Sequence, residues 1–292
     1  MDKNLERLKS KYMDIEIPSD LDDVVNKALN RPRKKNRTPI KILIGLGAAA
    51  ALLMIVLNTN PVLAKNLSDV PVIGNVVNVM TFVEFKVDDE KHQANIKVPS
   101  ISNLKDKDLE KSLNEKYLKE NKQLYQEFMQ EVESLKKQGD GHIGVESGYV
   151  VKTDNEKILS IGRYVVNTVG SSSTTFKYDT IDKKKQVIVT LPILFKNQNY
   201  IETISGNIKD QMKQQMKEDK TKVYWILDAG VENPIDPFEK ITANHNFYIN
   251  QDNKLVISFD KYEVAPGYMG VVEFIIPTEI LSGDLVGSEY IK

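Results

Sequence analysis

The sequence predicts an α+β protein that crosses a membrane once and carries an outer domain of antiparallel sheets and two main helices. Three observations support this prediction. The chain contains one long uncharged run, the segments on its two sides differ in charge and pattern, and helix and strand patterns alternate after it. The run, from Ile42 to Leu57, contains no charged and no hydrogen-bonding side chain. As a helix it reaches only about 24 Å, and about 34 Å with the uncharged residues 58–64, enough for a hydrocarbon core of about 30 Å. We therefore expect a transmembrane helix over residues 39–60.

The charge distribution predicts which side of the membrane each flank occupies. Residues 1–41 carry 11 Lys/Arg and 7 Asp/Glu, whereas the whole chain of 292 residues carries 40 and 41. The seven bases from Lys27 to Lys41 have no acidic residue among them, and such a flank stays in the cytoplasm. A nucleic-acid-binding patch is the alternative, which the neighbouring apolar run disfavours. The expected location is the cell membrane, with a cytoplasmic N-terminus and an extracellular C-terminal domain.

Cysteine is absent from the chain. An outer domain without disulfides must be stabilised by its own core, which its size of more than about 200 residues permits. The absence also suits a bacterium that lacks an outer membrane.

The inner segment, residues 1–38 with a basic linker, predicts short cytoplasmic helices. Ser19 can cap a helix whose first turn is acidic. An apolar stripe then follows at helical spacing: Leu21, Val24, Val25, Ala28 and Leu29. Two short helices cannot bury a core of their own, so the stripe is expected to fold on a protein partner. A frayed tail lying on the membrane surface is the alternative.

The juxtamembrane segment, residues 61–88, contains a candidate protease site. Pro61 breaks the helix, and Val62 at −3 and Ala64 at −1, followed by Lys65, match what signal peptidase accepts. The apolar stretch Leu67–Phe85 either lies in the membrane interface and hides the scissile bond, or forms a strand that leads into the outer domain.

The outer domain divides into module 1, residues 89–195, and module 2, residues 196–292. Each module reads as a helix followed by strands, which indicates an α+β fold with antiparallel sheets. The predicted helices are Leu104–Gln138, ended by Gly139, and Tyr200–Lys217. The predicted strands are Lys86–Asp88, Ala94–Pro99, Gly148–Thr153, Lys157–Asn167, Thr174–Thr180, Gln186–Thr190, Val223–Leu227, Asn246–Asn250, Lys254–Asp260 and Val271–Ile276.

The sequence does not read as an enzyme. Its three histidines, His92, His142 and His245, are far apart, and no catalytic motif or phosphate-binding glycine loop occurs. We therefore expect no cofactor, no metal and no catalytic residue. A hidden pair of carboxylates for glycan hydrolysis remains the open alternative.

Three blocks of module 2 carry a resemblance to a known family. They are Asn246-Phe247-Tyr248-Ile249, then Phe259-Asp260-Lys261-Tyr262-Glu263-Val264-Ala265-Pro266-Gly267-Tyr268-Met269-Gly270, and Phe274-Ile275-Ile276-Pro277. They resemble the C-terminal module of RsiV-type anti-sigma factors of Gram-positive bacteria. Arg163–Asp182 is similar to the companion module, and Ile17–Leu29 to the sigma-binding start. One departure is Val169-Gly170-Ser171-Ser172 where relatives often have Gly-Gly-Ala-His, so no histidine role transfers there.

The resemblance implies a membrane-anchored anti-sigma factor. The stripe Leu21, Val24, Val25, Ala28 and Leu29 would hold an extracytoplasmic-function (ECF) sigma factor. The outer domain would bind lysozyme, after which signal peptidase cuts at Val62, Ala64 and Lys65 and a site-2 intramembrane protease cuts within the span. Pro266 and Tyr268, with Ser171 and Ser172, are the expected lysozyme-binding residues.

Two alternatives stay open. The tyrosines near Pro266 can simply be packing residues of a turn. The chain can also be a membrane-anchored cell-wall or glycan-binding module without signalling output. Capture of a sigma factor by residues 1–38 would separate that module from an anti-sigma factor.

Overall fold

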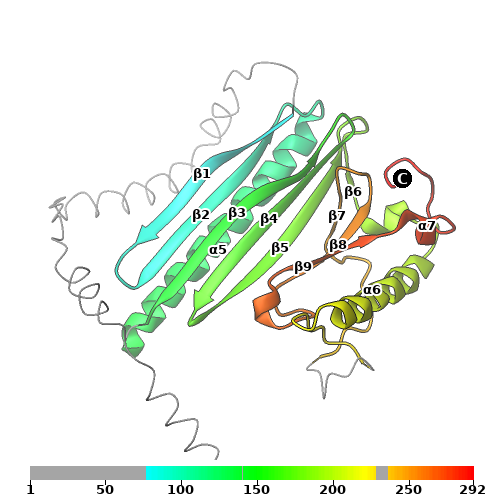
Figure 1. The fold of residues 1–292 in the computed structure, drawn as a ribbon. Helices are drawn as coiled ribbons and strands as arrows, with labels where there is room; N and C mark the ends of the chain where they lie inside the picture. Colours follow the sequence, from blue (N-terminus) through cyan, green and yellow to red (C-terminus); the bar gives the residue numbers. More distant parts are fainter. Residues whose placement is uncertain (1–76, 140, 228–235) are drawn as a thin grey trace, which may run out of the picture. The chain divides into compact units, whose positions relative to one another are not determined.

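The computed structural model describes residues 77–139, 141–227 and 236–292 (Figure 1). The predicted inner segment, the transmembrane helix over residues 39–60 and the protease site lie outside these ranges. Within the described ranges, no helix combines the length and the apolar character needed to cross a membrane.

Module 1 is built on a six-stranded sheet whose strands lie in chain order and whose first strand, residues 78–88, belongs to the segment 61–88 described above as juxtamembrane. Its strands are β1 (Asn78–Asp88), β2 (His92–Ser102), β3 (Ile143–Asp154), β4 (Ile158–Val169), β5 (Ser171–Asp182) and β6 (Val187–Val189). All neighbours pair antiparallel except β2 and β3, which run parallel. The parallel pair follows from the connection, because a parallel neighbour requires a crossover and the long helix α5 (Lys107–Gln138) supplies it.

Helix α5 covers one face of this sheet, and Figure 1 shows it running behind the strands. Asp106 caps its N-terminus by accepting bonds from the backbone N–H groups of Asp108 and Leu109, and Gly139 ends it at φ 110°. Its apolar side chains pack in one core with those of the strands. The buried members include Leu113, Tyr117, Phe128, Val132, Ile96, Val98, Leu159 and Ile161.

Module 2 has its own core between a helix and a three-stranded antiparallel sheet. Its elements are η1 (Leu191–Leu194), α6 (Asn199–Glu218), β7 (Phe247–Ile249), β8 (Leu255–Phe259), η2 (Gly267–Met269), β9 (Val272–Ile276) and α7 (Thr278–Leu281). Ile204, Ile208 and Met212 of α6 are fully buried in this core together with Phe259 and Phe274. The core also takes in Val189 and Leu191, so it starts before residue 196.

The two modules are joined by hydrogen bonds from buried side chains. Thr153 Oγ1 donates to the carbonyl of Ile249 at 2.5 Å, and the hydroxyls of Tyr178 and Ser258 lie 3.1 Å apart. At the C-terminus, the Tyr290 hydroxyl donates to Asp182 at 2.8 Å.

The α+β prediction is confirmed for the described residues, with helices at 107–138 and 199–218 close to their predicted bounds. The strand predicted at Val223–Leu227 is wrong. Tyr224 and Ile226 are buried, so the alternation is real. However, the backbone of Trp225 bonds to Val264 and Phe238 in irregular segments instead of to a strand. For Leu67–Phe85, residues 78–85 belong to β1, which favours the strand alternative there.

Candidate ligand-binding surface

The Tyr268 loop, Pro266–Gly270, follows two buried anchors. Val264 and Ala265 are in the core, and the one-turn helix η2 starts directly after Pro266. The turn is closed by bonds from the N–H of Met269 to the carbonyl of Pro266 and from the N–H of Gly270 to the carbonyl of Gly267. Gly270 leaves the turn at φ 67° and ψ −149°, a conformation open essentially to glycine.

Tyr268 is the most exposed large apolar side chain of this loop, with 68% of its surface in solvent. Its hydroxyl donates a 2.9 Å bond to the carbonyl of Thr221, which fixes the ring at its far end. An exposed aromatic ring held in one orientation costs little entropy when a partner covers it, which suits a protein contact.

The β4–β5 hairpin, which turns at Gly170, is tied to the segment just before this loop. Lys261 donates to the Ser172 hydroxyl at 2.9 Å through Nζ and to the carbonyl of Thr174 at 3.0 Å through its backbone N–H. The N–H of Phe176 donates to Asp260 at 2.7 Å. Burial raises the pKa of Asp260, and this bond from Phe176 opposes the rise.

The structure therefore connects the predicted residues Ser172, Pro266 and Tyr268 through Lys261 and Tyr262. The ring of Tyr262, which is 43% exposed, lies against Gly267 of the loop. Ser171 is exposed at the start of β5. Sequence reasoning assigned no role to Lys261, because its bond to Ser172 joins segments that meet only in the fold. For Tyr262 it offered only packing within a turn.

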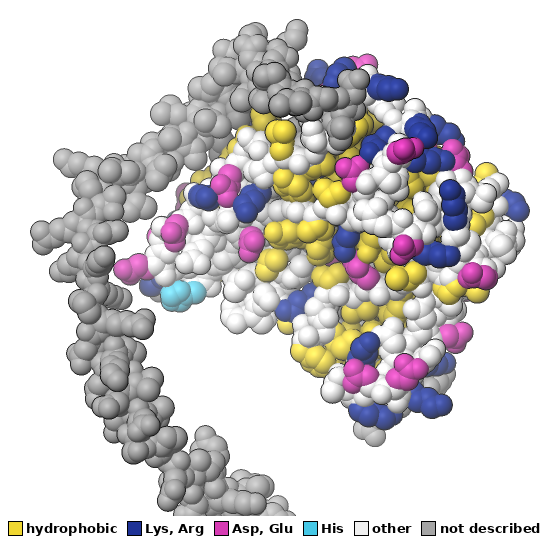
Figure 2. Space-filling model, turned by 45° about the horizontal axis from the view of Figure 1, so that its top comes forward, with side chains coloured by type: hydrophobic (Ala, Val, Ile, Leu, Met, Phe, Trp, Pro, Cys, Tyr) yellow, Lys and Arg dark blue, Asp and Glu magenta, His cyan; other side chains and the backbone are white. Residues whose placement is uncertain are grey.

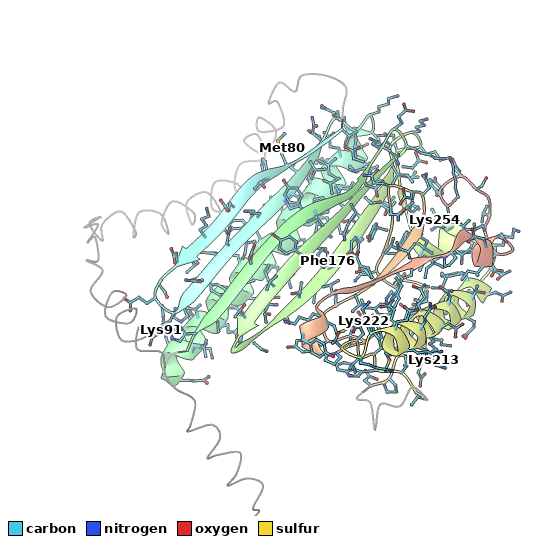
Figure 3. All side chains as sticks on the ribbon, viewed as in Figure 1. Met80, Lys91, Phe176, Lys213, Lys222 and Lys254 are labelled. Atoms are coloured by element: carbon cyan, nitrogen blue, oxygen red, sulfur yellow. The ribbon has the colours of Figure 1, made fainter. Side chains whose placement is uncertain are left out.

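An aromatic row that the sequence analysis missed runs beside this surface. It consists of Tyr164, Phe176, Tyr178 and Tyr248, with successive ring centroids 5.8, 5.5 and 5.2 Å apart. Figure 3 shows Phe176 on the face of the sheet opposite to α5. Glycines of β3 and β4 leave room for these rings, since a Cβ at Gly148 or Gly162 would lie within 2.8 Å of a tyrosine atom. These strand glycines were the available signal.

Lys152 and Glu273 hold one end of the aromatic row. The Lys152 ammonium lies 2.6 Å from Glu273 and 4.9 Å from the ring centre of Tyr248. The hydroxyls of Tyr178 and Tyr248 donate to the same Glu273 carboxylate at 3.1 and 2.9 Å. Burial and this carboxylate both raise the pKa of Tyr248, so its hydroxyl stays protonated.

The surface lies at the end of the sheet opposite to the start of β1. Asn78 pairs with Ser102 at one end of the sheet. At the other end, next to the β4–β5 hairpin, Gly144 pairs with Gln93 on one side and with Thr168 on the other. A strand of 11 residues spans about 36 Å, so the hairpin and the start of β1 are separated by roughly that distance along the strands.

Charges of both signs occur on one face of the described part. Figure 2 shows acidic and basic side chains interspersed with apolar patches on the face that it draws. In the described ranges, no group of three or more His, Cys, Asp or Glu side chains could hold a metal ion.

His245 supplies a pH-dependent contribution to the stability of module 2. Its ring packs on Phe259 at 4.6 Å, and burial lowers its pKa from 6.5 to about 4, against a bond with the Ser258 backbone that raises it. Below about pH 6.5 the His245 imidazole binds a proton in the unfolded chain but stays neutral in the folded chain. The free energy of unfolding therefore falls as the pH drops from about 6.5 to about 4.

The loss expected over this window is at most about 3 kcal/mol. The variant His245→Phe keeps the ring and removes the proton, so its melting temperature should fall less between pH 7 and pH 5 than that of the unchanged protein. Equal slopes of melting temperature against pH would contradict this assignment.

The predicted sigma-binding residues Leu21, Val24, Val25, Ala28 and Leu29 and the cleavage residues Val62, Ala64 and Lys65 lie outside the described residues. Their roles remain predictions.

One curated relative is similar to this chain over its full length. The anti-sigma-V factor RsiV of Bacillus subtilis (strain 168) is 48% identical over 292 residues, which is 100% of both chains. A family model described as a protein of unknown function, DUF3298, matches residues 193–279.

Two crystal structures of DUF3298 family proteins are similar to this chain. One, from Pseudomonas aeruginosa PAO1, has a TM-score of 0.50 and 13% identity and covers 77% of this chain and 99% of its own. The other, from Bacteroides fragilis NCTC 9343, has a TM-score of 0.47 and 16% identity over 72% and 94%. At 13% identity, the first shows a shared fold alone.

Proposed function

The chain belongs to the family of the anti-sigma-V factor RsiV, and from this premise we propose that it holds an ECF sigma factor until lysozyme binds outside. Membership makes it a membrane anti-sigma factor, a regulator of transcription with a sigma factor as partner, and not an enzyme. Release of the sigma factor follows cleavage near Val62, Ala64 and Lys65 by signal peptidase and then cleavage in the membrane by a site-2 protease.

The observation that carries the lysozyme proposal is the exposed Tyr268 ring on a loop that is already formed. Pro266 precedes it, the Thr221 carbonyl fixes it, and Lys261 ties the loop segment to Ser172 on the other module. A preformed aromatic anchor beside a second segment is a common arrangement of protein-binding hot spots.

The position of this surface is compatible with ligand-triggered cleavage. A ligand bound near the β4–β5 hairpin sits about 36 Å along the strands from the start of β1. The residue where β1 begins, Asn78, is thus left uncovered by contacts at the hairpin. A protease can cut before β1 only if the bound ligand does not cover that part of the chain.

The variant Tyr268→Ala is expected to weaken capture of lysozyme at least about tenfold, because aromatic anchors at interfaces typically carry 2 kcal/mol or more. Folding should be spared, since the side chain is mostly in solvent and makes one hydrogen bond. Titration of the full-length chain in lipid nanodiscs with lysozyme measures the affinity.

The matched control is Tyr268→Phe, which keeps the ring and removes the bond to Thr221. It should bind nearly as well as the unchanged chain. An affinity of Tyr268→Ala equal to that of the unchanged chain removes Tyr268 from the interface.

The aromatic row favours one second candidate, a membrane-anchored cell-wall or glycan-binding module. Partly exposed aromatic rings can pack on the apolar faces of sugars, and Tyr164 and Phe176 of the row are partly exposed, whereas Tyr248 is buried. A groove of about 490 Å³ on the same sheet is lined by polar residues, including Gln93, Asn95, Glu146 and Thr168. This candidate predicts that deleting residues 1–38 changes no phenotype. Capture of a sigma factor by residues 1–38 would exclude a module without signalling output.

A further inference from the structure

We propose that Tyr262 is a positioning residue of the lysozyme-binding surface, which it holds in shape by packing on Gly267. This inference rests on the function proposed for that surface. Its observations are the backbone angle of Tyr262, the contact of its ring and the bonds of its neighbour Lys261.

Tyr262 has an unusual backbone conformation, with φ at 74°. A bulky aromatic residue rarely adopts a positive φ, so the surrounding structure must stabilise this angle. The bonds on both sides do so: the N–H of Asp260 donates to the Glu263 carboxylate at 2.7 Å, and the N–H of Glu263 donates to the carbonyl of Asp260 at 3.0 Å. The buried Val264 then fixes the exit of the turn.

The angle directs the Tyr262 ring onto Gly267. A Cβ atom at Gly267 would lie only 2.2 to 2.4 Å from the ring atoms Cε1, Cζ and OH. A side chain at residue 267 would therefore displace the ring, whereas the backbone of Gly267 does not have a positive φ and does not itself require glycine. The ring packs against the backbone between Pro266 and Tyr268, the two residues expected to face the ligand.

Lys261 extends the same support to the other module. Its Nζ bonds Ser172 while it lies 5.2 Å from the ring centre of Tyr262. The β4–β5 hairpin and the Tyr268 loop are thus held by two consecutive residues. This arrangement presents both segments to a ligand as one rigid surface, which lowers the entropy cost of binding.

The test uses full-length variants in nanodiscs and lysozyme as the probe. Gly267→Ala should displace the ring and lower the affinity roughly tenfold, while the ligand-facing side chains stay unchanged. Tyr262→Asn should lower it similarly, because asparagine accepts the positive φ and removes the ring. Tyr262→Phe should retain the affinity.

A double-mutant cycle gives the most specific prediction. In the Tyr262→Asn background no ring remains for the new methyl group to meet, so Gly267→Ala should have no further effect. The matched control is Gly206→Ala on α6, where an added Cβ has nothing within 4 Å. Its affinity should be unchanged.

The single tryptophan of the chain, Trp225, reports on the unliganded loop, because its backbone N–H donates to the carbonyl of Val264, two residues before Pro266. Its emission should shift in Gly267→Ala and Tyr262→Asn and stay the same in Gly206→Ala and Tyr262→Phe. If Gly267→Ala lowers the melting temperature strongly, Tyr262→Asn carries the test.

Two outcomes overturn the inference while leaving the proposed function intact. In the first, Tyr268→Ala binds weakly but Gly267→Ala and Tyr262→Asn bind like the unchanged chain. In the second, the double variant loses affinity by the product of the losses measured for Gly267→Ala and Tyr262→Asn alone. If Tyr268→Ala also binds like the unchanged chain, the proposed surface is wrong and the inference falls with it.

Discussion

Replacing Arg163 with methionine is expected to lower the free energy of unfolding by about 3–5 kcal/mol, the scale for breaking a buried ion pair on one side. Arg163 on β4 is 8% exposed and lies 2.6 Å from Glu120 of α5 and 3.2 Å from Asp179 of β5, which is itself 6% exposed. Its guanidinium also lies 4.4 Å from the ring centre of Tyr117. Without it, among the described residues, the Asp179 carboxylate keeps Lys116, at 2.8 Å, as its ion-pair partner.

The titration of Glu120 reflects the same network. Burial alone would raise its pKa, but the hydrogen bond and charge of Arg163 and the charge of Lys177 hold the pKa below its usual range. Arg163 thus keeps helix α5 attached to the middle of the sheet. Thermal unfolding measures the effect, and a loss of this size corresponds to a melting temperature lower by about 10 °C.

The matched control is Lys177→Met on the neighbouring strand. Lys177 pairs in register with Arg163 and lies 3.6 Å from the same Glu120 carboxylate, but it is 68% exposed. An exposed ion pair contributes at most about 1 kcal/mol. If Arg163→Met destabilises the chain no more than Lys177→Met, the buried pair does not hold α5 to the sheet.

A charge in the inner stripe is expected to abolish retention of the sigma factor. The variant Leu21→Asp places a carboxylate among apolar positions that, in our proposal, are buried on the partner. An unpaired charge in such a contact weakens binding by about a hundredfold or more. Sigma-dependent transcription should then be on without lysozyme, at the level of a strain that lacks the chain, as a reporter measures.

The control for charge alone is Asn26→Asp, which adds the same carboxylate off the stripe. It should leave the sigma factor retained. Equal effects of the two variants would show that the inner charge, and not the apolar stripe, determines retention.

The sequence predicted most elements of the fold because their signals are local. The apolar face of residues 107–138 and the capping Gly139 define α5 by themselves. The parallel pairing of β2 with β3 has no local signal, since it depends on how α5 returns the chain to the sheet. At Val223–Leu227 the alternation of burial was correct, but a strand also needs a partner, which lies elsewhere in the fold.

The candidate surface was predictable only where its signals are local. Tyr268 stood out because proline and glycine flank an aromatic residue there, and Ser172 followed from the family resemblance. Lys261 and the aromatic row depend on contacts between modules, such as the bond from Lys261 to Ser172, 89 residues apart in the chain. A pattern in one segment carries no information about such a contact.

The most direct test of ligand-triggered release is to add lysozyme to cells and follow the chain with an antibody against its C-terminus. The account predicts a fragment that starts at Lys65 and appears only after lysozyme is added, in the unchanged chain and not in Tyr268→Ala. A fragment present at the same level without lysozyme, or an intact chain with lysozyme bound, would contradict it.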